Sequence, residues 1–477
     1  MQFNSTDFAL FFVAFFFLYW NVTKNNLKAQ NLLILISSYV FYAWWDYRFL
    51  FLLIFSTLLD YITGLKIHQS SSKVRTFWLV ISVAVNLGFL GLFKYYNFFI
   101  ESFATVLSSV GFQPNIWTLN VILPVGISFY TFHGLSYVFD IYNKKIEPTK
   151  NFIDYAVFVS FFPLLVAGPI ERATHLLPQV KAKRVFDYKK SIDGLRQILW
   201  GLFKKIVIAD NCATFVNVIF SNHEAYNGST LLLGAVFFAF QIYGDFSGYS
   251  DIALGIARLL GFDLIRNFAF PYFSRDIAEF WRRWHISLSS WFRDYLYLPL
   301  GGSKGNLTVQ IRNIFIIFLV SGFWHGANWT FIVWGSLNAL YFIPLLILGK
   351  NRENLNIVAE GRLLPSVKEF FQITSTFFLT VIAWIFFRAD NVGMAYDYIS
   401  EIFSMSIFSV PQILPKKLIA TLFLFYFVEW IQRDKQHPLQ FETLQIPKFV
   451  RWAIYYAIVG MLFFYGGDEQ GFIYFQF

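Results

Sequence analysis

Residues 308–348 read TVQIRNIFIIFLVSGFWHGANWTFIVWGSLNALYFIPLLIL. Two apolar runs, 308–325 and 329–348, flank a short centre that contains Gly326 and Asn328. A helix that crosses a bilayer needs about 20 mostly apolar residues. We therefore expect two membrane-spanning helices joined by a tight turn, with His325 at or near that turn. At 1.5 Å per residue, the first arm is about 25 Å long, which places His325 well into the membrane.

The composition extends this interpretation to the whole chain. Of the 477 residues, 57% are hydrophobic, 22% are aromatic and only 14% are charged, whereas a soluble domain carries about 25% charged residues. Phe occurs 62 times, which is difficult to hide in one aqueous core. The composition therefore predicts an all-α polytopic membrane protein, with residues 1–477 forming a single integral membrane domain.

Apolar runs predict about 11–12 transmembrane helices, and no soluble domain or repeat separates them. The first run is expected to be a retained span, because no small-residue cleavage motif follows it. The predicted spans are 8–20, 31–47, 49–65, 76–99, 121–141, 193–220, 229–260, 308–325, 329–348, 369–388, 416–431 and 450–467.

Charge distribution indicates the orientation of the chain. The net charge of +9 comes from basic residues in short segments between apolar runs, such as 66–75, 144–150 and 172–190. This pattern is typical of cytoplasmic loops and not of a nucleic-acid-binding stripe. We therefore expect these loops in the cytoplasm and no nucleic-acid partner. The single cysteine, Cys212, excludes an internal disulfide and is expected to be a packed thiol.

Two apolar segments contain signals that break a helix. Segment 151–170 contains Phe162-Pro163 and Gly168-Pro169, and basic loops flank it on both sides. Segment 276–300 is rich in Trp and Arg. Proline interrupts helices, and irregular backbone at membrane depth must be buried in protein or line water. We expect re-entrant or interfacial helices here, around a central cavity or tunnel that opens toward the cytoplasm.

Polar residues in apolar segments are costly, so they are candidate site residues. Gln241, Asp245 and Tyr249 recur every four residues and share one helical face. Gly244 and Gly248 between them allow a close approach of two helices. The polar face either packs against another helix or lines a substrate cavity, and the sequence leaves both alternatives open.

A second candidate group interleaves charges with tryptophans. It comprises Trp281, Arg282, Arg283, Trp284, His285 and Ser289. Trp and Arg at headgroup level can serve as an interfacial anchor. The arginines can equally bind an anionic donor such as the phosphates of coenzyme A. Anchoring does not need His285, which on a continuous helix would share a face with Trp281 and Ser289.

The third candidate is Trp324-His325-Gly326, at the turn of the hairpin. An apolar setting disfavours the imidazolium, which leaves a neutral ring that can accept a proton. A hydrogen-bonded packing histidine is the alternative. We expect no metal site, because the seven histidines are scattered without ligand spacing. The motifs of serine hydrolases, P-loop enzymes and dinucleotide-binding proteins are also absent.

Several segments, in this order, resemble one family. They are 123–132, 166–170, 245–251, 280–289, 321–326, 384–389 and 472–477. With them the chain resembles the membrane-bound O-acyltransferases, in the bacterial branch typified by the alginate O-acetylation membrane protein. The resemblance implies that His325 is the catalytic histidine, that His285 takes the second, His-or-Asn position, and that Asp245, Arg282 and Arg283 line the reaction tunnel.

The chain departs from the family pattern at two positions. His133 stands where Gln is expected, and Asn338 stands where related chains often have His. Neither departure changes the two central histidines, but both leave the exact lining of the pocket open.

The resemblance also implies a reaction and its participants. The donor is a thioester, acetyl-CoA or an acyl carrier protein, and no cofactor is bound. The acceptor is an extracytoplasmic polysaccharide or cell-wall polymer, and an esterase-like acetyltransferase outside the membrane is the expected partner. The expected location is the cytoplasmic (inner) membrane of a bacterium. D-alanyl transfer to teichoic acid and a transporter or flippase without covalent chemistry are the alternatives.

Overall fold

The computed structural model describes residues 1–112, 118–119, 122–441, 446–467 and 470–473. Within these ranges every regular element is helical, as the sequence predicts. The chain forms two compact units, Met1–Phe186 with Leu260–Leu264, and Asp187–Leu259 with Ile265–Phe477. The prediction of a single membrane domain over 1–477 stays a prediction.

The first unit contains nine α-helices in its described part. They are α1 (Thr6–Phe17), α2 (Leu27–Asp46), α3 (Leu50–Gln69), α4 (Ser72–Leu90), α5 (Tyr96–Ser109), α6 (Ile127–Tyr142), α7 (Phe152–Ser160), α8 (Phe162–Leu165) and α9 (Ala173–Lys181).

Two boundaries in this unit show how local residues end a helix. The helix predicted over 121–141 begins only at Ile127, because Pro124 and the left-handed Gly126 (φ 74°) precede it; residue 121 lies outside the described residues. The predicted break in 151–170 falls at Phe161, between α7 and α8, with Pro163 in the first turn of α8. This segment is therefore two short helices, as a broken element requires.

The second unit holds the candidate site residues. Its described helices are α10 (Tyr188–Leu202), α11 (Asp210–Ser221), α12 (Gly228–Leu259), α13 (Ile277–Arg283), α14 (Ile286–Phe292), α15 (Leu307–His325), α16 (Trp329–Ile347), α17 (Val367–Arg388), α18 (Val392–Ile402), α19 (Lys416–Ile431) and α20 (Lys448–Phe464). A π-helical segment, Phe203–Ala209, joins α10 to α11.

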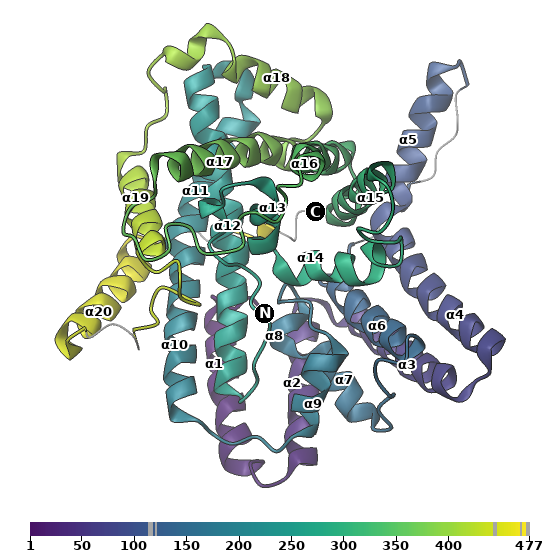
Figure 1. The fold of residues 1–477 in the computed structure, drawn as a ribbon. Helices are drawn as coiled ribbons and strands as arrows, with labels where there is room; N and C mark the ends of the chain where they lie inside the picture. Colours follow the sequence, from purple (N-terminus) through teal and green to yellow (C-terminus); the bar gives the residue numbers. More distant parts are fainter. Residues whose placement is uncertain (113–117, 120–121, 442–445, 468–469, 474–477) are drawn as a thin grey trace. The chain divides into compact units, whose positions relative to one another are not determined.

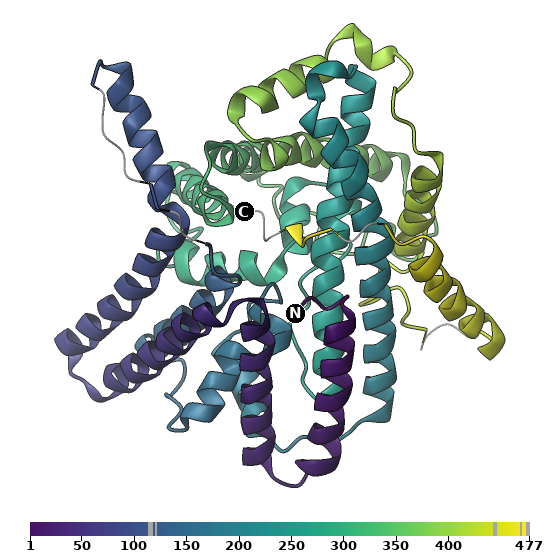
Figure 2. The same cartoon turned by 180° about the vertical axis from the view of Figure 1, so that it is seen from behind.

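The long helix α12 is the centre of this unit. It packs along α10 and α11, and both views show it running beside α10 (Figures 1 and 2). Most of its residues are buried, including those of its polar face. The helices α15 and α16 form the predicted hairpin, and α16 also packs on α17.

Six segments of the described chain are long and apolar enough to cross a membrane. They are Leu27–Gln69, Ser72–Ser109, Gly228–Leu259, Leu307–His325, Trp329–Ile347 and Val367–Arg388. The first two contain 43 and 38 residues, which exceeds the length of about 20 that one crossing needs. The polytopic, all-helical class is confirmed, and the number of 11–12 crossings stays a prediction.

Candidate active site

His325 is the last residue of α15, at the turn of the hairpin. The two helices touch there through glycine: a Cβ added at Gly322 would lie 2.2 Å from the carbonyl oxygen of Phe331. Such small residues let helix backbones approach each other closely in membranes. His325 is 4% exposed, and its ring lies 5.2 Å from that of Trp334 and 5.3 Å from that of Phe387. The histidine is therefore buried among aromatic rings at the turn of the hairpin.

His285 lies in a break of the chain and not on a continuous helix. Helix α13 ends at Arg283, α14 begins at Ile286, and His285 itself has left-handed backbone angles (φ 43°, ψ 53°). The expectation that His285 shares a helical face with Trp281 and Ser289 is therefore wrong. Left-handed backbone is uncommon for a residue other than glycine and costs about 1–3 kcal/mol. The break turns the His285 ring to 6.4 Å from that of His325.

A polar contact fixes His285 from the other side. Its Nδ1 lies 3.1 Å from Oδ1 of Asn267, and Phe246 packs edge-on against the ring at 4.7 Å. His285 is fully buried, and burial lowers its pKa to about 3 because the charged ring would lose its hydration. The ring is therefore neutral at physiological pH.

The polar face of α12 is buried among charged and aromatic groups. Asp245 forms an ion pair with Lys205 at 2.9 Å and accepts a hydrogen bond from the backbone N–H of Ile473 at 2.6 Å. The Tyr249 ring lies 5.1 Å from that of Phe472, and Gln241 is 8% exposed. For Asp245 the contacts are those of a packing interface, and the role of the face in a tunnel stays a prediction.

The predicted close approach along α12 is present. A Cβ on Gly248 would lie 2.8 Å from the carbonyl oxygen of Gly201, and one on Gly244 would lie 2.9 Å from that of Lys204. Real Cβ atoms do not come so close to backbone oxygen, so glycine is what lets α10 and its π-helical extension contact α12. This contact places Lys204 and Lys205 beside the polar face.

The tryptophans of the second group pack among aromatic side chains of α15, α16 and α17. Trp281 donates its Nε1–H to Oδ1 of Asn338 at 3.1 Å. Asn338, which stands where related chains often have His, is therefore hydrogen-bonded to a side chain of α13. Trp284 is 1% exposed and lies 5.0 Å from Trp384. Trp324 lies 6.2 Å from the His285 ring.

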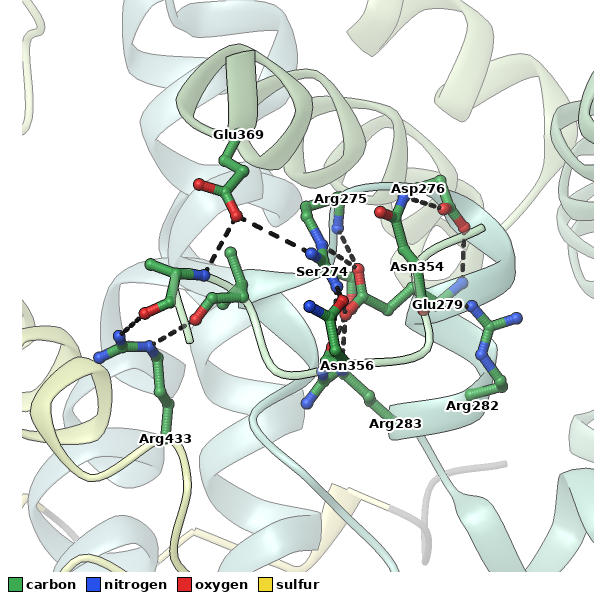
Figure 3. Close-up of polar contacts among 12 residues, drawn as sticks. Ser274, Arg275, Asp276, Glu279, Arg282, Arg283, Asn354, Asn356, Glu369 and Arg433 are labelled. Carbon is green, nitrogen blue, oxygen red and sulfur yellow. Dashed lines mark hydrogen bonds and ion pairs between the residues drawn. The ribbon is translucent and has the colours of Figure 1, made fainter. Parts of the chain in front are cut away.

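Ser289 and the two arginines form hydrogen bonds with groups other than the histidine pair. The Ser289 hydroxyl donates to the carbonyl oxygen of Trp284 at 3.4 Å. Arg282 is exposed and donates to the carbonyl oxygens of Asn351 and Asn354. Arg283 donates to the Glu279 carboxylate at 2.8 Å (Figure 3).

Figure 3 shows that the contact of Arg283 belongs to a network of charged groups around Glu279. The carboxylate of Glu279, which is 1% exposed, binds both Arg275 and Arg283. Both arginines also reach the carbonyl oxygen of Asn356. The network therefore fastens the connection between α16 and α17 to helix α13, and Arg282 extends it at the exposed end.

A small polar pocket is lined in part by Asn267, the residue that contacts His285. Its lining includes Lys204, Tyr243, Asp251, Arg266, Asn267 and Glu429. Lys204 pairs with Asp251 at 2.6 Å, and Tyr243 donates its hydroxyl to the Glu429 carboxylate at 2.9 Å. Because Asn267 also contacts His285, the pocket adjoins the histidine pair.

The sequence interpretation missed most of this pocket. Lys204 and Glu429 are charged residues in otherwise apolar runs, which is the signal that should have singled them out. Asn267 lies in a loop and carries no comparable signal. In the described part of the chain no three His, Cys, Asp or Glu side chains are grouped as metal ligands. The prediction of no metal site stays a prediction.

A comparison with known families identifies the chain. The model of the MBOAT, membrane-bound O-acyltransferase family, matches residues 130–387, which include both central histidines. The chain belongs to the membrane-bound O-acyltransferase family. It is therefore a multi-pass membrane protein and an O-acyltransferase, as the resemblance implied.

Three relatives define its place in the family. The probable alginate O-acetylase of Pseudomonas aeruginosa is 40% identical over 90% of this chain and 80% of its own length. The peptidoglycan O-acetyltransferase of Helicobacter pylori is 36% identical over 80% of this chain and 75% of its own. The teichoic acid D-alanyltransferase of Bacillus subtilis is 28% identical over 48% of this chain and 60% of its own. The chain therefore belongs to the alginate O-acetylation branch of the membrane-bound O-acyltransferases.

Proposed function

We propose that this O-acyltransferase moves an acetyl group from a cytoplasmic thioester across the inner membrane of a bacterium, toward hydroxyls of an extracytoplasmic polysaccharide or cell-wall polymer. The observation that carries the proposal is the buried pair His285 and His325, 6.4 Å apart by their ring centroids. The relatives that cover most of this chain are named for O-acetyl transfer, which supports acetyl as the group transferred.

The proposed chemistry is attack of a hydroxyl on a thioester. The hydroxyl oxygen forms the new C–O bond, His325 takes the hydroxyl proton as general base, and the C–S bond breaks. The departing thiolate then receives that proton from His325, so the products are an ester and a thiol and the histidine is neutral again. Such general-base catalysis contributes about 10²–10⁴ in rate, and the aromatic rings around His325, which is 4% exposed, limit the access of bulk water.

The donor and the partners complete the proposal. The donor is acetyl-CoA or an acetylated carrier protein, with no resident cofactor. Exposed Arg282, beside the Glu279 network, is the residue proposed to meet the donor's anionic groups. The proposed partner outside the membrane is an esterase-like acetyltransferase that completes transfer to the polymer.

The second candidate function is D-alanyl transfer to teichoic acid. It is favoured by the likeness to the Bacillus subtilis enzyme, which covers 48% of this chain. The same histidine pair would serve either acyl group, whereas the donor and the acceptor polymer would differ. A transporter without covalent chemistry has no support, because the family consists of transferases.

Mass spectrometry of surface polymers tests the proposal. Cells that carry the wild-type chain are compared with cells that carry His325→Ala, after immunoblotting has shown equal amounts of protein in the membrane. We expect the polymer to lose its acetyl esters in the variant. Unchanged acetylation would remove His325 from catalysis, and D-alanyl esters in place of acetyl esters would select the second candidate.

A further inference from the structure

Asn267, in the loop after α12, holds the segment that carries His285. Its backbone carbonyl accepts a hydrogen bond from the N–H of Ile286 at 2.9 Å, and its side chain is 1% exposed. The side-chain oxygen lies 3.1 Å from Nδ1 of His285. We propose that Asn267 is a positioning residue that holds His285 in the tautomer with a proton on Nδ1, so that Nε2 is a hydrogen-bond acceptor. The catalytic meaning of this tautomer rests on the proposed function; the tautomer itself does not.

A neighbouring backbone group identifies the Asn267 atom that faces His285. Oxygen and nitrogen of an asparagine amide are assigned from their partners. The atom that faces His285 lies 3.2 Å from the backbone N–H of Ser287. A backbone N–H can only donate. The atom is therefore the oxygen, an acceptor, and Nδ1 of His285 must carry the proton that it receives.

The other amide atom is consistent with this orientation. Nδ2 of Asn267 donates to the Ser250 hydroxyl at 3.4 Å. The Ser287 hydroxyl donates to the same Asn267 oxygen at 3.0 Å. With the amide rotated, an N–H group of Asn267 would instead face the backbone N–H of Ser287, which cannot accept a hydrogen bond.

The tautomer decides what the second ring nitrogen can do. A neutral imidazole carries one proton, so a proton on Nδ1 leaves a lone pair on Nε2. Nε2 of His285 is buried and has no hydrogen-bond partner among the described residues. Burial holds the pKa of His285 near 3, so the ring does not gain a second proton at physiological pH. His285 consequently accepts a hydrogen bond and cannot donate one to a developing oxyanion.

This assignment separates the roles of the two histidines. At a centroid distance of 6.4 Å their nitrogens are too far apart for a direct hydrogen bond, which needs about 3 Å. The hydroxyl that reacts gives its only proton to His325. Nε2 of His285 therefore accepts a hydrogen bond from a different O–H group, which belongs either to a sugar acceptor or to a bound water. A donor other than His285 must stabilise the oxyanion.

Nitrogen-15 NMR of the full chain in lipid nanodiscs tests the tautomer directly. Histidine is labelled on both ring nitrogens, and the difference from a His285→Gln sample isolates the His285 signals. At pH 7 we expect Nδ1 to have the shift of a protonated nitrogen and Nε2 that of an unprotonated one. A protonated Nε2 overturns the proposal. Because the measurement needs no turnover, it stands even if acetyl transfer is the wrong function.

A substitution at Asn267 tests the consequence for catalysis. Asn267→Asp keeps the oxygen acceptor but adds a negative charge beside Nδ1, which favours the doubly protonated ring and turns Nε2 into a donor. For each protein we compare the transfer rate at pH 6 with the rate at pH 8. We expect this ratio to be at least tenfold lower for Asn267→Asp than for wild type. Ser287→Ala and Ser250→Ala are the controls, since each removes a neighbour of Asn267 but keeps the contact with His285. An Asn267→Asp profile that matches wild type, with the protein folded, overturns the positioning role.

Discussion

The ring of His285 lies 6.4 Å from that of His325, with the ring planes at 61°. His285 precedes the first turn of α14, whereas His325 ends α15. Both side chains therefore come from helix ends, where the backbone changes direction. Because neither ring is on the regular face of a helix, their distance depends on the contacts that hold these two breaks in the backbone.

The hairpin that carries His325 depends on Gly322. We expect Gly322→Ala to lower the free energy of unfolding by about 1–3 kcal/mol, the usual cost of overpacking, because the added Cβ would lie 2.2 Å from the Phe331 carbonyl oxygen. Acyl transfer should fall with it, since His325 is one turn away. Thermal unfolding in detergent micelles and a transfer assay measure the two effects. Gly460→Ala in α20 is the matched control, because nothing lies within 4 Å of its Cβ; equal effects of the two substitutions would contradict the prediction.

The ion pair of Asp245 with Lys205 is buried, so its loss should be costly. We expect Asp245→Asn, which keeps an acceptor for the Ile473 N–H, to lower the free energy of unfolding by about 3 kcal/mol. Lys205 keeps its second partner, Asp210, at 2.8 Å, so the protein should still fold. Thermal unfolding and KM for the thioester are measured together. A raised KM at unchanged stability would instead support the tunnel-lining role.

The two neighbouring arginines should respond differently to substitution. Arg283→Gln removes one of the two arginines that bind buried Glu279, so we expect a clear drop in melting temperature. Arg282→Gln leaves Glu279 paired, and its exposed position suits an anionic donor. We expect about a tenfold higher KM for acetyl-CoA, the loss of one charge-assisted hydrogen bond, with little change in melting temperature. If KM stays the same, Arg282 only fastens the connection between α16 and α17.

The pair of His175 and Glu171 predicts a pH dependence of stability in the first unit. The hydrogen bond from His175 Nδ1 to Glu171, at 2.7 Å, raises the pKa of His175 above its usual 6.5. Its folded-state pKa exceeds the unfolded value, so this contribution is fully present below about pH 6.5 and is lost as pH rises through the folded pKa. We expect wild type to unfold at a higher temperature than His175→Gln at pH 6 and the two curves to converge toward alkaline pH. Parallel curves across this range would show that the histidine does not gain stability from Glu171.

Much of the fold could be predicted from the sequence, because a membrane helix is determined by residues that are close together in the sequence. The hairpin predicted over 308–325 and 329–348 is α15 and α16, Leu307–His325 and Trp329–Ile347. Its boundaries differ by one residue at each outer end. Apolar length and the Asn328 side chain, which caps α16 by accepting from the Thr330 N–H, decide such boundaries locally. The error at 121–141 arose where Pro124 and Gly126 override an apolar run.

What the sequence determined by itself is the class of the protein and the residue at its centre. Apolar runs and scarce charge require a polytopic helical membrane protein, and His325 stands out as a histidine at the turn of one hairpin. Only the tertiary structure decided what surrounds it. The left-handed break at His285 and its contact with Asn267, eighteen residues earlier, join segments that no helical period relates. The spacing of apolar residues and the composition describe one segment at a time. A site is assembled by contacts between segments, and these contacts depend on packing in three dimensions.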